Sequence, residues 1–269
     1  AVYQYTEGKG NIQVWDFAWR PAARAHAVQV ETPDARIAAA LRGFSASELA
    51  GEGAPGRELW VLERRCRYAR DRAWLAAAWP RVAAGAEALI NNQQRSSLWE
   101  HCWAWAGLNG AAHLARESGH AAEAGRYEAQ AARLRKMLMI YADSELGRDA
   151  RDFAVVVWPT RALAPNHRWL AATFDDRWHT LVGAAGRYRP SFEQPRFDVA
   201  EAHNRLWMGE RARALEMLDY FLSHRPPDPA EVALLARDLF VFEENDSLVF
   251  AAGVPVDWLA PGRRVAISG

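Results

Sequence analysis

The sequence contains little cysteine, no excess of either charge and no long apolar run. Its two cysteines, Cys66 and Cys102, are too few for a disulfide framework or a cysteine-rich zinc site. They either pair with each other or lie buried as free thiols, and burial is the favoured alternative. The longest apolar candidates, such as residues 153–159, fall far short of the roughly 20 residues that a membrane helix needs. The sequence therefore predicts no membrane span.

Signatures of nucleic-acid, metal and nucleotide binding are missing as well. Lysine plus arginine and aspartate plus glutamate each number 33, so the net charge is zero, whereas a nucleic-acid-binding protein usually carries a basic excess. The eight histidines lack a metal-ligand spacing such as HExxH, and GxGxxG, Walker and GxSxG motifs are absent. We therefore expect no nucleic-acid partner, no metal and no cofactor.

The first ten residues are polar and lack the basic and apolar regions of a signal peptide. The mature form of an exported protein would look the same. We therefore expect a periplasmic or secreted protein if an export signal has been removed, and a cytoplasmic one otherwise. The oligomeric state is not predicted.

What the sequence does contain is the composition of a globular protein with many tryptophans. Hydrophobic residues make up 50% and charged residues 25%, which excludes a disordered tail, a coiled coil and a collagen-like fibre. There are 13 Trp against 7 Tyr and 10 Phe. The flat face of Trp stacks on the C–H surface of a sugar as readily as it fills a core, so the count is a hint of carbohydrate binding.

The pattern of apolar residues divides the chain at residue 34. Residues 1–33 read as a β-like or irregular segment, with partial alternation over 11–19. From residue 34 to 269 apolar residues recur at helical spacing, which predicts one helical domain. A short strand is expected at the C-terminal end, over 265–267. The expected helices cover about 34–43, 56–70, 71–90, 99–117, 121–141, 169–182, 198–207, 211–223 and 230–242.

Local signals mark several helix ends and one helix contact. Asp71 is a predicted N-cap, and Gly119 is a predicted C-terminal cap. Pro80 predicts a kink or a break into two helices. Gly107 and Gly110 lie on a narrow face of small residues, which predicts that another helix packs closely there.

Helical hairpins of this length fit either an open solenoid or a closed α/α toroid. Residues 108–138 look locally like a tetratricopeptide repeat, but no second segment reproduces them at a fixed period. Five strings in order favour the toroid: YARDRAWLAAAWPRV (68–82), WEHCWAWAGLNGAAHLARESG (99–119), VWPTRALAP (157–165), GERARALEMLDYFLSHRP (209–226) and DSLVFAAGVPVDWL (246–259). With them, the chain resembles the six-hairpin glycosidase superfamily over roughly residues 56–264.

This resemblance implies an all-α fold, an (α/α)6-type toroid of helical hairpins with short β segments at the termini. The order of the five strings matches bacterial members of the superfamily that are expected to act on glycosides. The resemblance therefore also implies a protein that acts on glycosides. The chain is short for twelve helices, and the junctions at 91–97 and 228–231 are abrupt. The toroid is therefore expected to be incomplete, either because the protein is a reduced member or because the given sequence lacks loops.

Hydrolysis of a glycosidic bond needs two carboxyl groups that flank the sugar. Glu100 is the candidate proton donor, because Trp99 and Trp103 around it would desolvate the carboxyl and raise its pKa. The Trp99-Glu100 pair also resembles the Trp-Glu of glucoamylases, in which that Glu is the proton donor. His101 departs from this pattern, since the family usually has a second Glu there. The alternative role for Glu100 is a carboxylate that stabilises a helix N-terminus.

The second carboxylate is less clearly marked. Glu193 lies in an expected loop among aromatic residues and is the candidate base, with Asp16 as an alternative early in the chain. Asp198 and Glu201 have the spacing of a helix cap and its capping box. The acidic cluster at 243–246 fits a solvated or structural role.

Candidate sugar contacts are aromatic or polar side chains near the ends of expected elements. A histidine beside Glu201 joins them as one member of a sugar-binding pair, although a satisfied core histidine is its alternative. The candidate substrate contacts are Trp15, Asp16, Trp19, Trp99, Trp103 and His203.

The sequence thus predicts a glycoside hydrolase that acts on an oligo- or polysaccharide by paired-carboxylate acid/base catalysis. The alternative is a non-catalytic helical-repeat protein or degenerate toroid that binds carbohydrate or protein partners. An enzyme should place two carboxylates about 5–10 Å apart across a pocket, whereas a binding module should show aromatic residues and no such pair.

Overall fold

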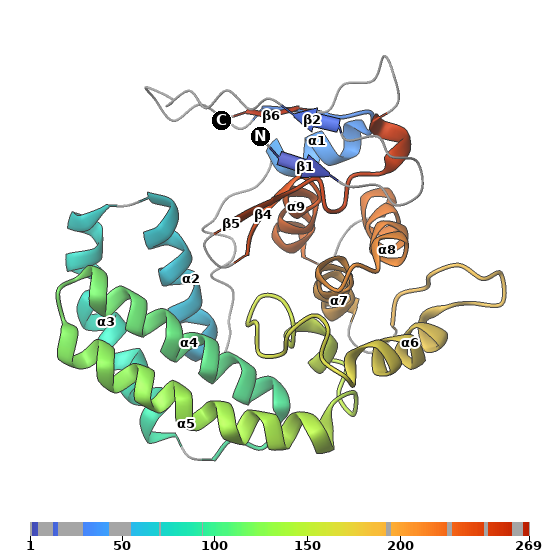
Figure 1. Cartoon of the computed structure of the whole chain (residues 1–269). Helices are drawn as coiled ribbons and strands as arrows, with labels where there is room; N and C mark the ends of the chain where they lie inside the picture. Colours follow the sequence, from blue (N-terminus) through green and yellow to red (C-terminus); the bar gives the residue numbers. More distant parts are fainter. Residues whose placement is uncertain are drawn as a thin grey trace.

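Helices dominate the part of the chain that the structure describes (Figure 1). The computed structural model describes residues 2–4, 13–15, 29–42, 55–69, 71–92, 94–191, 195–224, 228–244, 247–259 and 266–268. The prediction of a mainly helical chain is confirmed. The α-helices in these ranges are α1 (Ala35–Arg42), α2 (Pro55–Ala69), α3 (Arg72–Asn91), α4 (Leu98–Glu117), α5 (Ala121–Glu145), α6 (Leu170–Leu181), α7 (Pro195–Trp207), α8 (Arg211–Ser223) and α9 (Pro229–Asp238).

Three short antiparallel strand pairs accompany the helices: β1 (Val2–Gln4) with β2 (Gln13–Trp15), β3 (Gln29–Glu31) with β6 (Ala266–Ser268), and β4 (Val241–Glu244) with β5 (Ser247–Phe250). The predicted C-terminal strand is confirmed as β6. Because β3 pairs with β6, the predicted N-terminal segment and the end of the helical domain share one sheet.

The β4–β5 hairpin corrects the prediction of a helix over 230–242. Helix α9 ends at Asp238, and the strand begins at Val241. The chain leaves the helix because the Phe242 ring packs on Trp207 at 4.2 Å between centroids, a tertiary contact that local periodicity does not reveal.

Helices α2 to α5 pack on one another and form an arc along the left and lower edge of Figure 1. Helices α2 and α4 approach closely where two glycines meet. A Cβ atom on Gly107 would lie 2.5 Å from the Cα atom of Gly56, so a larger residue would push the helices apart. The predicted close packing of the small-residue face is confirmed. We call these four helices the α2–α5 group.

The two predicted helix caps of the α2–α5 group are confirmed, while α5 runs to Glu145, four residues past its predicted end. The side chain of Asp71 accepts a 3.0 Å hydrogen bond from the backbone N–H of Trp74 and caps α3. Gly119 follows α4 with φ of 80°, a left-handed conformation that glycine adopts without strain. Helix α3 continues through Pro80, so the alternative of a break into two helices is wrong. Burial of Leu75 and Val82 on either side of the proline holds the helix together.

Helices α7, α8 and α9 form a second group, against which α1 also packs. Residues 146–169 and α6 lie between this α7–α9 group and the α2–α5 group (Figure 1). Asn204 of α7 holds the connecting segment, because its Oδ1 accepts hydrogen bonds from the backbone N–H groups of Val157 and Trp158 at 2.8 and 2.9 Å. Its Nδ2 donates to the Trp158 carbonyl at 2.7 Å.

Both cysteines are buried free thiols, as expected. Cys102 of α4 lies in the apolar core next to the connecting segment, where burial raises the pKa of its thiol above the ordinary range. Among the described helices, none combines the length and the apolar character that crossing a membrane requires.

Candidate functional site

The candidate site is a cavity of about 380 Å³ bounded by the end of α3, the α3–α4 connection and the facing sides of α4 and α5. This volume lies within the range of small-molecule sites. We call it the α4–α5 cavity. Its apolar lining consists of Leu89, Ile90, Leu108, Leu134 and Met137. Its polar lining consists of Arg95, His101, Gln130, Arg133 and Tyr141.

Helical periodicity places the side chains that α5 contributes to the cavity. Gln130, Arg133, Met137 and Tyr141 follow one another at intervals of three or four residues, so they line one stripe of α5. This stripe mixes polar and apolar groups, unlike the uniformly apolar stripe that a helix turns toward a core. The α5 side of the cavity is therefore amphipathic.

The Glu100 carboxylate is engaged at the start of α4 and does not line the α4–α5 cavity. Its Oε2 accepts hydrogen bonds from the backbone N–H groups of Ser96 at 2.8 Å and Ser97 at 3.2 Å, and the Ser97 hydroxyl accepts one from the Glu100 backbone N–H. This is a complete capping box. Glu100 therefore has the alternative role predicted for it, a carboxylate that stabilises the N-terminus of a helix.

The expected rise in the pKa of Glu100 is wrong. Partial burial favours the neutral acid, but the backbone and hydroxyl donors of Ser96 and Ser97 stabilise the charged form, so the pKa of Glu100 lies below its ordinary value. A proton donor near neutral pH needs the opposite shift. The tryptophans do not desolvate the carboxylate enough to offset its donors.

His101 presents one free acceptor to a ligand. Its Nδ1 lies 2.8 Å from the Ser97 carbonyl oxygen, which can only accept, so Nδ1 carries the hydrogen. Burial lowers the pKa of His101, and the charge of Arg95 lowers it further, so the ring is neutral at pH 7. In this tautomer Nε2 carries a lone pair. The ring stacks on Tyr141 at 4.2 Å between centroids, which fixes its plane.

Two arginines supply the positive charge of the cavity. Arg95 is half-buried and donates to the Leu89 carbonyl oxygen, and desolvation lowers the pKa of its guanidinium. Arg133 is exposed on α5. Within the described residues, neither guanidinium forms an ion pair with a carboxylate, and no acidic side chain lines the cavity. Glu100 is the nearby negative charge, and its carboxylate is held by Ser96 and Ser97.

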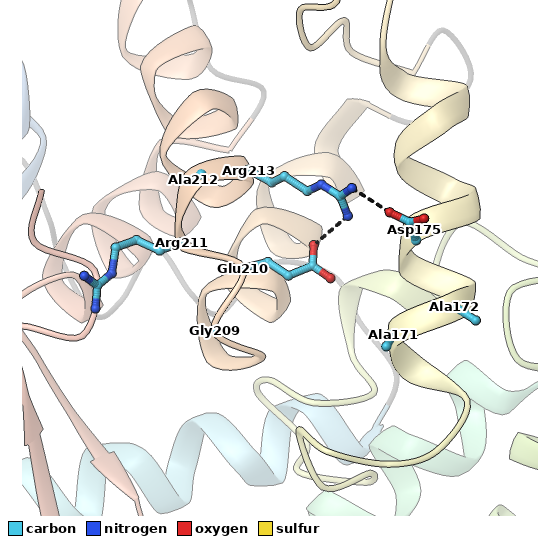
Figure 2. Close-up of a pocket in the computed structure, with 8 residues that line it drawn as sticks. All are labelled: Ala171, Ala172, Asp175, Gly209, Glu210, Arg211, Ala212 and Arg213. Atoms are coloured by element: carbon cyan, nitrogen blue, oxygen red, sulfur yellow. Dashed lines mark hydrogen bonds and ion pairs between the residues drawn. The ribbon is translucent and has the colours of Figure 1, made fainter. Parts of the chain in front are cut away.

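A second cavity, of about 640 Å³, lies between α6 and the start of α8 (Figure 2). Figure 2 shows Arg213 reaching between Glu210 and Asp175, at 3.3 and 2.5 Å, while Arg211 points the opposite way. The Nε of Arg211 donates to the Ala252 carbonyl oxygen at 2.6 Å. The charged side chains of this α6–α8 cavity are thus engaged with each other or with the backbone, which gives it a structural role.

His203 lies in the core of the α7–α9 group, fully buried. Its Nε2 is 2.7 Å from the Asp238 carboxylate, its Nδ1 is 3.4 Å from that of Glu231, and the Trp158 ring stacks on it at 3.6 Å. Burial alone would lower the pKa of His203, but the two carboxylates raise it above its ordinary value. Asp238 and Glu231 therefore favour the protonated form of the buried ring, and Glu201 is not its partner.

Asp198 and Glu201 also differ from the predicted cap and capping box, because α7 begins three residues before Asp198. Asp198 accepts hydrogen bonds from the Tyr188 hydroxyl at 2.8 Å and the Ser191 backbone N–H at 2.6 Å. Glu201 pairs with Arg205 at 2.6 Å in the buried core. Both carboxylates also pair with Arg177 of α6, Asp198 at 3.5 Å and Glu201 at 3.2 Å, and so connect α7 to α6.

The predicted aromatic contacts divide into buried and partly exposed ones. Trp103 is buried and meets Trp60 edge to face at 6.1 Å, and Trp60 meets Trp158 in the same way at 6.0 Å. This chain of rings connects Trp103 to His203. Trp99 is half-buried and extends this series of rings at the Trp103 end, with 6.4 Å between the centroids of Trp99 and Trp103.

The remaining predicted residues are not brought to the cavity by anything that the structure describes. Trp15 lies in β2, paired with Val2 of β1. Asp16, Trp19 and Glu193 fall outside the described residues. Their predicted roles as base and sugar contacts stay predictions.

The polar lining of the α4–α5 cavity was not predicted from the sequence. A detectable signal exists in the stripe Gln130, Arg133, Met137 and Tyr141, which mixes polar and apolar residues on one helical face. No comparable signal marks Arg95, because only the fold of the α3–α4 connection brings it to α5. The chain matches no protein-family model, no curated protein and no solved structure in the comparisons.

Proposed function

We propose that this protein binds carbohydrate in the α4–α5 cavity. The observation that carries the proposal is the division of the lining into apolar side chains and hydrogen-bonding groups of both polarities. A sugar ring has the same division, with apolar C–H faces and a rim of hydroxyls that both donate and accept. Gln130 and Tyr141 can donate or accept, and Nε2 of His101 can accept.

Binding without hydrolysis is the form of the proposal that the described carboxylates favour. Hydrolysis needs a carboxyl pair across a pocket. Among the described residues, the candidate acid Glu100 is engaged in a capping box, and the cavity lining contains no carboxylate. The non-catalytic alternative from the sequence is therefore preferred over the glycoside hydrolase.

The proposed architecture is an incomplete (α/α)6-type toroid. Consecutive helices pair through short connections in α2–α3, α4–α5 and α7–α8, which supports a succession of hairpins. The chain of rings from Trp103 to His203 lies where the two helical groups meet, as an inner lining of such a ring would.

Calorimetric titration against a panel of neutral and acidic oligosaccharides tests the proposal, with Gln130→Trp as the variant that blocks the cavity. Gln130 is half-buried at the lining, so the indole would occupy space that the ligand needs. We expect binding by the natural protein and at least a tenfold loss in the variant. The control is Ala132→Trp, which adds the same ring at an exposed position of the same helix.

Two outcomes would contradict the proposal. Binding of no saccharide in the panel removes it, and equal binding by Gln130→Trp places the sugar elsewhere. Analysis of the same mixtures for released products separates binding from hydrolysis. Sugar products would restore the glycoside hydrolase as the function.

A further inference from the structure

One side of α5, along the lower edge of the α2–α5 group in Figure 1, exposes large apolar side chains to solvent. Ile140 is 61% exposed and Met137 is 47% exposed. Trp169, next to the start of α6, is 44% exposed and adjoins them, because its Nε1 donates a 2.9 Å hydrogen bond to Oδ1 of Asp143. Neighbouring exposed apolar side chains mark interaction sites, whereas single ones do not. We call Lys136, Met137, Ile140, Asp143 and Trp169 the α5 patch.

The α5 patch carries one charge of each sign, two helical turns apart. Lys136 and Asp143 are seven residues apart, so both project from the same side of the helix. Lys136 is exposed and forms no ion pair within the described residues. Asp143 is exposed too, and the side chains of Trp169 and Arg168 both donate to its Oδ1. Oδ2 of Asp143 therefore has no donor among the described residues.

This spacing makes the α5 patch complementary to a second copy of itself. In a two-fold dimer each contact occurs twice, so a residue that faces a second residue of the partner is faced by it in return. When two α5 helices pack antiparallel, an axis beside Ile140 places Lys136 of each copy opposite Asp143 of the other, because residue 140 lies at the middle of the interval from 136 to 143. A parallel pairing in register would place like charges opposite each other.

We propose that the α5 patch is the interface of a homodimer, in which two α5 helices pack antiparallel with their Ile140 side chains in contact at the two-fold axis. Burial of the exposed apolar side chains supplies the attraction, and the two ion pairs select the register. The presence of Asp143 favours a second copy over an anionic lipid surface, which would repel it.

This inference is independent of the proposed function. Gln130 and Tyr141, which line the α4–α5 cavity, lie on a neighbouring side of α5, and Met137 lies between the two sides. The dimer therefore forms beside the cavity.

Sedimentation of the full chain tests the dimer. We expect a species of twice the 30.1 kDa of one chain, whose share grows as the concentration rises from about 1 to 100 µM. Ile140→Asp brings two carboxylates together at the axis and should leave a monomer. The matched control is Val256→Asp, which makes a similar replacement outside α5 at a side chain that is 74% exposed, and which should dimerise like the natural protein. An unchanged helical circular dichroism spectrum shows that each variant is folded.

Charge reversal tests the antiparallel register. Lys136→Glu and Asp143→Lys each bring like charges together in their own homodimers, and each should weaken dimerisation by at least about tenfold. An equimolar mixture of the two variants should recover it, because every contact between them pairs opposite charges. Asp143→Lys also loses the hydrogen bond to Trp169. This loss persists in the mixture, so it does not account for the recovery.

Each alternative result would overturn the inference. A natural protein that stays monomeric over the whole range removes the dimer, and dimerisation unchanged by Ile140→Asp places the interface on another surface. No recovery in the mixture would exclude the antiparallel register. A monomer that sediments with phosphatidylserine vesicles, and loses this property in Ile140→Asp, would assign the α5 patch to an anionic lipid surface.

Discussion

The α2–α5 group and the α7–α9 group are both helical, but different interactions hold them together. In the first, helices approach through glycine and alanine, and its ion pairs lie mostly on the surface, as between Arg126 and Glu87. In the second, α7 buries Asp198, Glu201, His203 and Arg205 almost completely. The packing of the α2–α5 group therefore depends on close fit between helix surfaces, whereas that of the α7–α9 group depends on the pairing of buried charged side chains.

This difference has a consequence for how each group tolerates change. Close backbone contact excludes even one added methyl group where the helices cross. A buried ion pair adds little net stability, yet removing one partner leaves an uncompensated charge in the core and costs several kcal/mol. The two groups are therefore expected to fail through different substitutions. Variants in each group, and in the segment between them, test this expectation.

The largest effect is expected from Arg205→Met in the α7–α9 group. The Arg205 guanidinium is fully buried and pairs with Glu201 and Glu210, each at 2.6 Å. Its removal should lower the free energy of unfolding by about 3–5 kcal/mol, measured by urea denaturation. The control is Arg116→Met, which breaks the exposed pair with Glu128 and should cost no more than about 1 kcal/mol. Similar losses in both variants would contradict the contrast between the groups.

The second effect concerns Asp152, in the segment between the two groups. Burial raises the pKa of Asp152 from 3.8 to about 7, against hydrogen bonds from Asp149 and Gly147. The folded protein therefore keeps a proton that the unfolded chain loses. Stability should fall by about 1.4 kcal/mol per unit as pH rises from about 4 to 7, and level off above.

Asp152→Asn removes this titration while keeping an oxygen that can accept the two backbone N–H groups. We expect the difference in unfolding free energy between variant and natural protein to grow in favour of the variant as pH rises from 5 to 7. Urea denaturation at several pH values measures it. Parallel pH profiles for the two proteins would show that Asp152 is ionised in the folded state.

A smaller effect is expected from Gly107→Ala in the α2–α5 group. The new Cβ would lie 2.5 Å from the Gly56 Cα and 2.9 Å from its carbonyl oxygen, so the helices must separate. The cost should be about 1–3 kcal/mol in thermal or urea unfolding. Gly125→Ala is the matched control, because Gly125 lies in the second turn of α5 and nothing lies within 4 Å of the position of its Cβ. It should stabilise the protein by about 0.5–1 kcal/mol. A neutral Gly107→Ala would mean that the α2–α4 contact is looser than described.

The smallest effect is expected from Glu100→Gln. The amide can keep part of the capping box but loses the charge at the helix N-terminus, which should cost about 0.3–1 kcal/mol. Saccharide binding should be unchanged, because the carboxylate does not line the α4–α5 cavity. If the protein proves to hydrolyse a glycoside, a loss of about 10²–10⁴ in rate would identify Glu100 as the proton donor after all.

Sequence reasoning succeeded where local chemistry decides the structure. The N-cap at Asp71, the C-terminal glycine at 119 and the bounds of α4 and α8 all follow from residues a few positions apart. It was wrong where distant contacts outweigh local preference. Helix α3 passes through Pro80 because the helix is packed on both sides of it, and α9 gives way to a strand because Phe242 meets Trp207.

The candidate site was only partly predictable for the same reason. Glu100, Trp99 and Trp103 were noticed together because they are neighbours in sequence, and the structure separates their environments into a capping box and an aromatic core. The α4–α5 cavity joins Arg95 to Arg133, which no local pattern connects. The stripe of polar and apolar residues on α5 can be seen in the sequence. It indicates a cavity only when the residues of α3 and α4 that face it are known.

Local sequence was enough to predict a mainly helical chain and the ends of most of its helices, and to favour buried thiols for both cysteines, because capping, periodicity and side-chain polarity act over a few residues. Only the packed structure shows that Glu100 is a capping carboxylate, that His203 lies buried between Asp238 and Glu231, and that Arg95 and Arg133 line the same cavity. The charge state of an ionisable group depends on its solvent exposure and on partners far away in sequence. Neither is set until the helices have packed.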